Sequence, residues 1–267
     1  MKKLLVLLLC VGLLGCSSNN NQQEEGNTLV VGMECAYAPF NWTQVDDNGF
    51  GVKINDVDYC DGYDVQMAKE IATQLNKELV IKKTGWDGLI PAVKNDQIDL
   101  IIAGMTQTPD RSEQIDFTDV YYSSEMVMIV KKDSNFTNAT SIQDFANAKV
   151  MGQQATIYDE VIDQIENVNH MTPQADYPMM VMSLLSGQTD ALTAELPVAV
   201  GVTKANPELT YITFTEGNGF VADTTVSIGL KKDSELTDAI NKALETISTE
   251  TRNQMMIDAT DRQPAAK

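Results

Sequence analysis

Short apolar runs alternate with segments of helical periodicity along most of this chain, and this alternation constrains its fold more than any other feature. Residues 63–75, for example, carry apolar side chains at helical spacing, whereas residues 98–103 form an apolar run of strand length. Such alternation favours an α/β architecture with largely parallel sheets. The expected strands are residues 28–33, 79–82, 98–103, 149–152, 189–193 and 209–214, and the expected helices are residues 63–75, 87–93, 141–145, 156–165, 177–185, 197–204 and 233–247.

Two extended runs end in the same four residues, Lys-Lys-Asp-Ser. The first repeat follows residues 121–130, and the second follows residues 226–230. This repeat is consistent with two strands that cross in opposite directions between two lobes, so that the first lobe is discontinuous. We predict a first lobe of residues 28–124 and 225–267, and a second lobe of residues 125–224 that includes the hinge strands.

The amino-terminal segment has the pattern of an export signal and is excluded from the fold. Lys2 and Lys3 precede an apolar stretch, residues 4–14, that is too short to span a bilayer. The stretch ends in Leu-Leu-Gly before Cys16, which resembles the bacterial lipobox. That resemblance implies cleavage before Cys16 and attachment of lipid, such as palmitate, to its sulfur. An ordinary secretory signal that ends near a cysteine is the alternative.

The segment that follows is polar and resembles a flexible tether. We therefore predict a signal peptide of residues 1–15 and a lipid-anchored tether of residues 16–27. The expected location is the outer face of the bacterial cell membrane.

The chain is strongly acidic, with a formal net charge of −19. This charge argues against nucleic acid and anionic lipid headgroups as partners. No metal-ligand spacing is visible, and His170 is the single histidine. Both observations weaken zinc binding and histidine-based catalysis, so we predict no metal, no cofactor and no catalytic residue.

Two of the four cysteines, Cys35 and Cys60, fall in the exported part of the chain, where a disulfide can persist. A bridge between them would fix the segment 41–61. Two free thiols are the alternative.

Arg111 stands at an unusual place for a cation. Thr108 can cap a helix that begins at Pro109, which puts Arg111 in the first turn, where the helix dipole disfavours positive charge. The position makes sense if an anion joins it, because free N–H groups and a guanidinium can hold a carboxylate together. The alternative is a solvated arginine paired with Asp110 or Glu113.

A set of short motifs, in order from about residue 28 to residue 252, resembles the polar amino-acid family of extracellular solute-binding proteins that serve ABC importers. The resemblance implies a periplasmic-binding-protein-like fold of type II, in which two hinge strands join two α/β lobes around the ligand. It also implies an ABC permease as partner and a monomeric state. The motifs are Val31-Gly32, Tyr37-Ala-Pro-Phe40, Gly62-Tyr-Asp64, Trp86-Asp-Gly-Leu-Ile-Pro91, Ile98-Asp-Leu-Ile-Ile-Ala-Gly-Met-Thr106, Thr108-Pro-Asp-Arg111, Asp116-Phe-Thr-Asp-Val-Tyr-Tyr122 and Ile228-Gly-Leu230.

The resemblance assigns the two charged ends of a free amino acid. Arg111 matches the arginine that holds the α-carboxylate, and Gly104 and Thr106 match positions that complete this cradle. Glu195 falls where the family usually has an aspartate that receives the α-ammonium. A solvated glutamate at the start of a helix is the alternative for Glu195.

The resemblance also assigns the surroundings of the ligand side chain. Tyr37 and Trp86 match rings that flank it, although Trp86 could instead anchor a core. Glu34 occupies the position at which relatives that bind basic amino acids carry an acid. Thr156 matches a turn that touches the carboxylate, but Ala155 departs from the family glycine there. Asp64 is expected to cap its helix.

The residues and the resemblance together predict a protein that binds a free polar amino acid, with a lean toward arginine, lysine or ornithine because of Glu34. A neutral polar amino acid such as glutamine or cystine is the alternative. Two weaker alternatives are an enzyme of the dehydratase type on the same scaffold and a sensory domain. No catalytic centre is marked in the sequence, so an enzyme is not expected.

Overall fold

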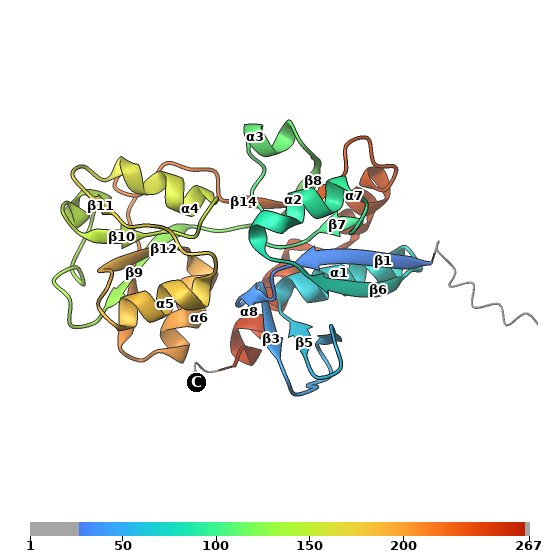
Figure 1. Ribbon diagram of the computed structural model, residues 1–267, viewed down its shortest axis with the longest axis horizontal. Helices are drawn as coiled ribbons and strands as arrows, with labels where there is room; N and C mark the ends of the chain where they lie inside the picture. The colour runs from blue at the N-terminus through green and yellow to red at the C-terminus, as the bar shows by residue number, and fades with distance from the viewer. Residues whose placement is uncertain (1–26, 265–267) are drawn as a thin grey trace, which may run out of the picture.

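The computed structural model describes residues 27–264, which form two lobes joined by crossing segments (Figure 1). The predicted signal peptide and Cys16 lie outside the described residues, as do most of the tether and the last three residues. Within residues 27–264, no helix is both long enough and apolar enough to cross a membrane.

The sheet of the first lobe mixes parallel and antiparallel strands. Strands β1, β6 and β7 run parallel, as a βαβ arrangement requires, whereas β14 runs antiparallel to both of its neighbours. The strand order is β6 (Glu78–Lys83), β1 (Thr28–Met33), β7 (Leu100–Ile101), β14 (Thr225–Leu230) and β8 (Asp116–Ser123).

The sheet of the second lobe repeats this plan. Strands β10, β11 and β12 are parallel, and β9 is antiparallel to β12 and β13. The order is β11 (Asn169–His170), β10 (Lys149–Met151), β12 (Ala191–Glu195), β9 (Met126–Lys131) and β13 (Leu209–Ile212). The expected parallel strands are therefore present, but each sheet ends in antiparallel strands.

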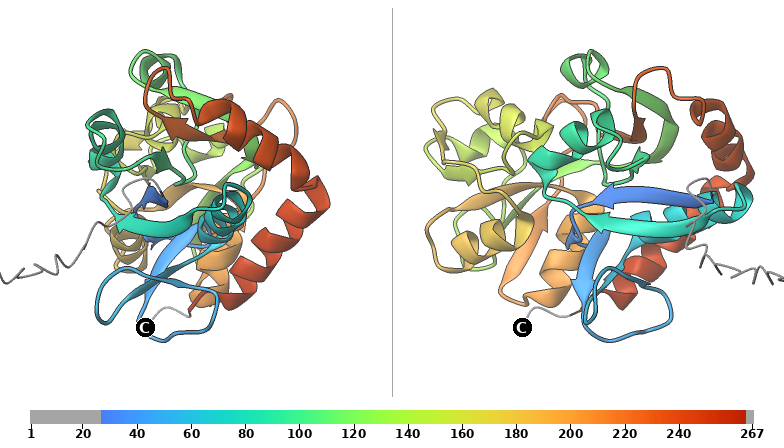
Figure 2. Two further views of the ribbon diagram at one scale, coloured as in Figure 1. Left: turned by 90° about the vertical axis from the view of Figure 1, so that its right-hand side faces the viewer. Right: turned by 45° about the vertical axis from the view of Figure 1, so that its right-hand side comes forward.

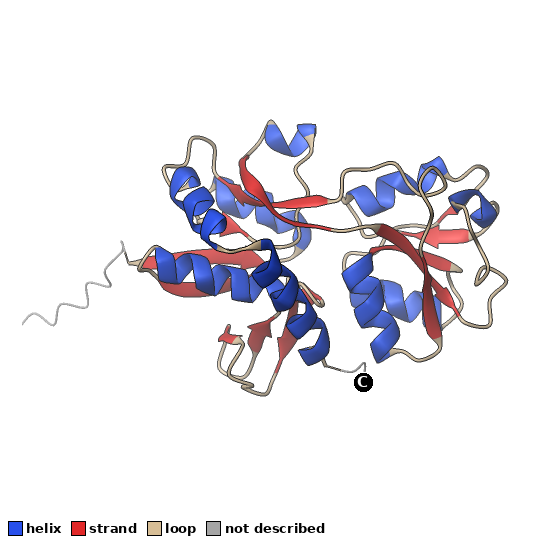
Figure 3. Ribbon diagram, turned by 180° about the vertical axis from the view of Figure 1, so that it is seen from behind, coloured by secondary structure: helices blue, strands red, loops and turns tan. Residues whose placement is uncertain are grey.

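The chain passes from the first sheet to the second between Ser123 and Met126, and returns between Ile212 and Thr225. The two passages lie side by side, since the Thr224 hydroxyl donates to the Ser124 carbonyl (Figure 3). The first lobe therefore contains strands from both ends of the described chain.

A small four-stranded sheet extends the first lobe and carries a disulfide between Cys35 and Cys60. The bridge ties the segment after β1 to the last of these strands in chain order. Figure 2 shows this sheet beside the last helix, α8 (Thr249–Arg262), and Arg262 pairs with the buried Asp61 at 3.1 Å. The strands are β2 (Ala36–Tyr37), β3 (Asn41–Gln44), β4 (Val52–Lys53) and β5 (Tyr59–Asp61).

Helices cover both sheets. In the first lobe, side chains of α1, α2 and α7 such as Ile71, Leu89 and Ile240 are fully buried with those of β14. Each such side chain contributes about 1.5–3 kcal/mol when removed from water. The helices are α1 (Tyr63–Gln74), α2 (Trp86–Lys94), α3 (Pro109–Ser112), α4 (Ile157–Glu160), α5 (Tyr177–Leu185), α6 (Leu196–Ala205) and α7 (Thr237–Thr246), with α8 last and with 3₁₀ turns at Ile142–Phe145 and Val161–Gln164.

Two of the expected elements differ from the structure, and one helix was missed. The strand predicted over residues 98–103 pairs only at Leu100–Ile101, and the helix predicted over 156–165 divides into α4 and a 3₁₀ turn. Helix α8 was not expected, because its polar sequence gives little helical periodicity.

The prediction that Asp64 caps its helix is also wrong. The cap position belongs to Gly62, whose φ of 138° and close approach to the Phe40 carbonyl leave no room for a side chain. Asp64 is fully buried and accepts hydrogen bonds from Asn41 Nδ2 and the Tyr121 hydroxyl, both at 2.8 Å. Asp64 therefore joins the small sheet and β8 to α1.

Candidate functional site

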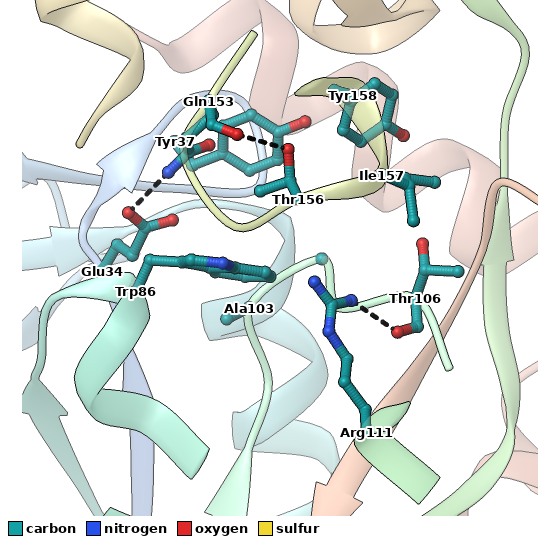
Figure 4. Close-up of a pocket in the computed structure, with 11 residues that line it drawn as sticks. Glu34, Tyr37, Trp86, Ala103, Thr106, Arg111, Gln153, Thr156, Ile157 and Tyr158 are labelled. Atoms are coloured by element: carbon teal, nitrogen blue, oxygen red, sulfur yellow. Dashed lines mark hydrogen bonds between the residues drawn. The ribbon is translucent and has the colours of Figure 1, made fainter. Parts of the chain in front are cut away.

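A cavity lies where the two lobes meet, and both lobes line it (Figure 4). In Figure 4, the Trp86 ring lies between Glu34 on one side and Arg111 on the other. The lining residues of the first lobe are Glu34, Tyr37, Trp86, Ala103, Gly104, Thr106 and Arg111, and those of the second lobe are Gln153, Thr156, Ile157 and Tyr158.

Arg111 is positioned by the short helix α3, as the sequence predicts. The Thr108 hydroxyl accepts a hydrogen bond from the Arg111 N–H at 3.3 Å, and Pro109 is the first helical residue. The guanidinium donates to the Thr106 carbonyl at 2.7 Å and stands 5.1 Å from the centre of the Trp86 ring. Burial lowers the pKa of Arg111 from its ordinary value, because it disfavours the charged guanidinium, and an anion placed beside it would offset that cost.

The carbonyl of Ala155 reaches across from the second lobe. It accepts hydrogen bonds from the Trp86 indole and from the Arg111 guanidinium, each at 3.0 Å. Ala155 has a φ of 57°, in the left-handed region that favours glycine. The departure from the family glycine is thus accommodated in the backbone conformation that glycine would adopt.

Glu195 ends strand β12 and is completely buried. The Tyr37 hydroxyl, from the first lobe, donates to its Oε1 at 2.7 Å, and its Oε2 has no hydrogen-bond partner among the described residues. Burial raises the pKa of Glu195 to about 8. The alternative of a solvated glutamate is therefore wrong, because the Glu195 side chain is completely shielded from solvent.

Tyr158 brings a second hydroxyl to this carboxyl. It lines the cavity and is close enough to influence the pKa of Glu195, although its hydroxyl forms no hydrogen bond of good geometry within residues 27–264. Burial, with the neighbouring Glu195, raises the pKa of Tyr158 well above its ordinary value, so the hydroxyl stays protonated. The unpartnered Oε2 and this hydroxyl together suit a cationic donor.

Glu34 lies at the other end of the cavity, directly after β1. The Gln153 amide, from the second lobe, donates to Glu34 Oε1 at 3.0 Å. Burial, with a smaller contribution from the nearby Asp176 and Asp87, raises the pKa of Glu34 to about 8. A cation at this end would relieve the cost of holding a negative charge there.

Gly104 and Thr106 line the cavity beside Arg111, but their polar groups are partly engaged. The Gly104 N–H donates to the Tyr121 hydroxyl at 3.0 Å, which leaves its carbonyl for a ligand. The Thr106 carbonyl accepts from Arg111, which leaves the Thr106 hydroxyl. Thr156 donates its hydroxyl to the Gln153 carbonyl at 2.8 Å.

The structure thus gathers all the predicted ligand-binding residues at one place, with Glu195 directly behind the cavity wall. Sequence reasoning missed Ala103, Gln153, Ile157 and Tyr158. Ile157 and Tyr158 follow Thr156 directly, so a helix start at that point could have drawn attention to them. Nothing in the sequence marks Gln153, because its role depends on Glu34, which lies 119 positions away.

The described part of the chain contains no group of three or more acidic, histidine or cysteine residues that could hold a metal ion. His170 lies on the surface, between Asp159 and Asp163 at 2.9 Å each, away from the cavity. The site is therefore made of ionic and aromatic side chains that suit a small zwitterion.

Comparison with known proteins agrees with this geometry. Residues 29–257 match the family of bacterial extracellular solute-binding proteins, family 3. The arginine-binding extracellular protein ArtP of Bacillus subtilis is 32% identical over 92% of each chain. The cystine-binding protein TcyJ of Escherichia coli is 29% identical over 83% of this chain and 77% of its own.

Among solved structures, the amino-acid ABC transporter substrate-binding protein AbpA of Streptococcus pneumoniae, bound to L-arginine, superposes with a TM-score of 0.77. It is 28% identical, and the match covers 89% of this chain and 96% of that one. The chain described here belongs to the family 3 of bacterial extracellular solute-binding proteins. The predicted family and the two-lobed fold are confirmed, and the family consists of binding proteins of transport systems and not of enzymes.

Proposed function

We propose that this protein binds a free amino acid with a cationic side chain, such as arginine, lysine or ornithine, and delivers it to an ABC permease. One observation carries the proposal: the guanidinium of Arg111 and the buried carboxyl of Glu34 line the cavity, and a second buried carboxyl, Glu195, lies behind it and is bonded to the lining residue Tyr37. A basic amino acid has the complementary set of charges, one carboxylate and two cations.

The arrangement of these groups supports one orientation of the ligand. The α-carboxylate pairs with Arg111, and the α-ammonium approaches Glu195 and the Tyr158 hydroxyl. The side chain then extends over the Trp86 ring toward Glu34 (Figure 4). Cationic groups that contact an aromatic face gain about 0.5–2 kcal/mol, which adds to the preference for a guanidinium or an ammonium.

The surroundings of Glu34 add to this preference. The opening next to Glu34 is lined by two further carboxylates, Asp87 and Asp176, and by a single cation, Lys83. A neutral side chain would leave Glu34 buried with only its bond to Gln153, and burial of a carboxylate without a cation is costly. A cationic terminus removes that cost.

A ligand placed in this way contacts both lobes and therefore favours their closure. Arg111 belongs to the first lobe and Glu195 to the second, so that a closed form binds the zwitterion better than an open one does. We propose residues 28–124 with 225–267 as the first lobe and residues 125–224 as the second. Closure then presents one defined shape to the permease.

A neutral polar amino acid, such as glutamine or cystine, is the second candidate. The similarity to the cystine-binding protein TcyJ favours it. The arginine-binding ArtP and the arginine-bound AbpA favour the first candidate.

A thermal-unfolding screen of the purified protein decides between the two candidates. The panel is the twenty common amino acids with ornithine, citrulline and cystine, and a ligand at 100 times its Kd stabilises the fold by about 2.7 kcal/mol. We expect a rise in Tm with arginine, lysine or ornithine. A rise confined to glutamine, cystine or another neutral side chain would reject the cationic ligand.

We further propose that Cys16 carries the lipid that anchors the protein to the outer face of the cell membrane, and that the protein acts as a monomer. The lipobox resemblance supports the anchor, and the extracellular family supports the compartment. A tether of residues 16–27 would leave the two lobes free to meet the permease.

A further inference from the structure

We propose that Gln153 is a specificity-determining residue, which sets the preference for a charged side-chain terminus by orienting the Glu34 carboxylate from the opposite lobe; this inference rests on the proposed function. Gln153 and Glu34 are each 5% exposed, so that their bond is shielded from water. A hydrogen bond to a charged group in such surroundings is among the stronger ones.

Both hydrogens of the Gln153 amide are used. One is donated to Glu34 Oε1 at 3.0 Å and the other to the Ala175 carbonyl at 3.1 Å. The Gln153 backbone also pairs with Gln174, next to Ala175. Gln153 is therefore held to the second lobe by its main chain and by its side chain, and presents a fixed donor to Glu34.

This donor leaves the rest of the Glu34 carboxylate available. An ionised carboxylate accepts about four hydrogen bonds, and Gln153 uses one of them, on Oε1. The bond also favours the ionised form of Glu34. Burial and the negative charges of Asp176, Asp87 and Asp64 favour the protonated form. Lys83, which lines the adjacent opening, is the cation on that side. A charged Glu34 is what distinguishes a cationic terminus from a neutral one.

The bond also links specificity to closure, since Glu34 follows β1 in the first lobe and Gln153 follows β10 in the second. Recognition of the side-chain terminus is therefore complete only when the lobes meet. An amino acid with a neutral terminus gains nothing from this link, whereas a basic one gains a fixed acceptor that ionises when the cation binds.

Arginine and citrulline provide the test, because they have nearly the same shape and differ in the charge of the terminus. We would measure the Kd of both by titration calorimetry for the wild-type protein and for Gln153→Leu, which keeps the size and removes the amide. We expect Gln153→Leu to lower the preference for arginine over citrulline about tenfold, and the arginine affinity of this variant to recover as pH rises from 6 to 8. Recovery at higher pH would not follow from a merely structural defect.

Gln154→Leu is the matched control. Gln154 is the adjacent amide and also bonds across the lobes, to the exposed Asp87 at 3.3 Å, but it does not line the cavity. The preference of Gln154→Leu for arginine over citrulline should stay within about twofold of the wild-type value. In a Glu34→Gln background, Gln153→Leu should have no further effect on the preference, because its partner carboxylate is gone.

An unchanged preference in a folded Gln153→Leu protein overturns the inference and leaves the proposed function standing, since the wild type still binds arginine. A further loss of preference in the Glu34→Gln background overturns it as well, because Gln153 would then act by another route. If Gln153→Leu fails to fold, Gln153→Met replaces it with a flexible side chain of similar length. A wild-type protein that binds neither ligand removes the proposed function, and the inference falls with it.

Discussion

The Tyr37 hydroxyl donates a 2.7 Å hydrogen bond to the Glu195 carboxyl, and this bond joins residues that are 158 positions apart and belong to different lobes. Glu195 is completely buried, and its second oxygen is unpartnered among the described residues. A buried carboxyl with one free oxygen, next to a cavity that both lobes line, is a site prepared for a cation.

Glu195→Gln should weaken the binding of arginine at least about 100-fold, because the α-ammonium would lose its charged partner in a buried place. The same change should leave the unfolding free energy of the protein without added amino acid unchanged or higher at pH 8, since it removes an unpaired buried charge. Tyr37→Phe should lower the affinity for arginine about tenfold, because it removes only one hydrogen-bond donor to Glu195. Calorimetry and urea unfolding test the three values, and a Glu195→Gln protein with wild-type affinity contradicts the assignment.

Arg111→Ala should also lower the affinity at least about 100-fold, since the ligand carboxylate would be buried without a cation. Its unfolding free energy should change by no more than about 1.5 kcal/mol, because Arg111 bonds to two backbone carbonyls only.

Arg252→Ala is the matched control for Arg111→Ala. Arg252 also bonds to backbone carbonyls, those of Ile247 and Val120 at 3.0 Å each, but far from the cavity. This variant should lose stability and keep its affinity. If Arg111→Ala kept its affinity for arginine and Arg252→Ala lost it, the assignment of Arg111 to the binding site would be wrong.

Binding should release protons near neutral pH. Glu34 and Glu195 each have a pKa of about 8, raised by burial from 4.5, so both are largely protonated at pH 7. A ligand with two cations stabilises the charged forms, and about one proton should leave each carboxyl. Calorimetry in two buffers with different heats of ionisation measures this release, which should fall by about half in Glu34→Gln. Uptake of protons would contradict it.

The same pKa values predict how stability depends on pH. The folded protein without added amino acid holds protons that the unfolded chain loses above its ordinary pKa of 4.5. Its unfolding free energy should therefore fall as pH rises from 4.5 to about 8. Saturating arginine should flatten this slope, and urea unfolding at several pH values tests both statements. If neither Glu34→Gln nor Glu195→Gln changes this slope, the pH dependence of stability comes from other groups.

The Cys35–Cys60 disulfide should stabilise the fold by about 3.5 kcal/mol, given a sequence separation of 25. The double variant Cys35→Ser with Cys60→Ser should lose about this amount in urea unfolding. It should also bind arginine more weakly, because Glu34 directly precedes Cys35. Reduction of the wild-type protein should reproduce both effects, and full affinity after reduction would show that the bridge does not hold Glu34 in place.

Cys16→Ser should abolish incorporation of labelled palmitate in a bacterial host and release the protein from the membrane fraction. The purified variant should bind arginine as the wild type does, since Cys16 precedes the residues that line the cavity in the sequence and is not one of them. Labelled palmitate that persists in Cys16→Ser would reject this residue as the anchor.

The sequence alone determined the elements that local chemistry controls. Thr108 and Pro109 set the start of α3, and their spacing puts Arg111 in its first turn. Alternating apolar runs gave the α/β class, and the repeated Lys-Lys-Asp-Ser ends indicated two crossing strands. The order of motifs from Val31-Gly32 to Ile228-Gly-Leu230 was enough to identify the family.

The tertiary structure alone decided where the polar partners meet. Asp64 looked like a helix cap, yet burial against Asn41 and Tyr121 made it an internal link. The sequence allowed Glu195 to be solvated. Only the folded structure, in which the Tyr37 hydroxyl bonds to it, made it a buried carboxyl. Gln153 had no sequence signal, because a hydrogen bond between residues on different lobes depends on how the lobes meet and not on any local pattern.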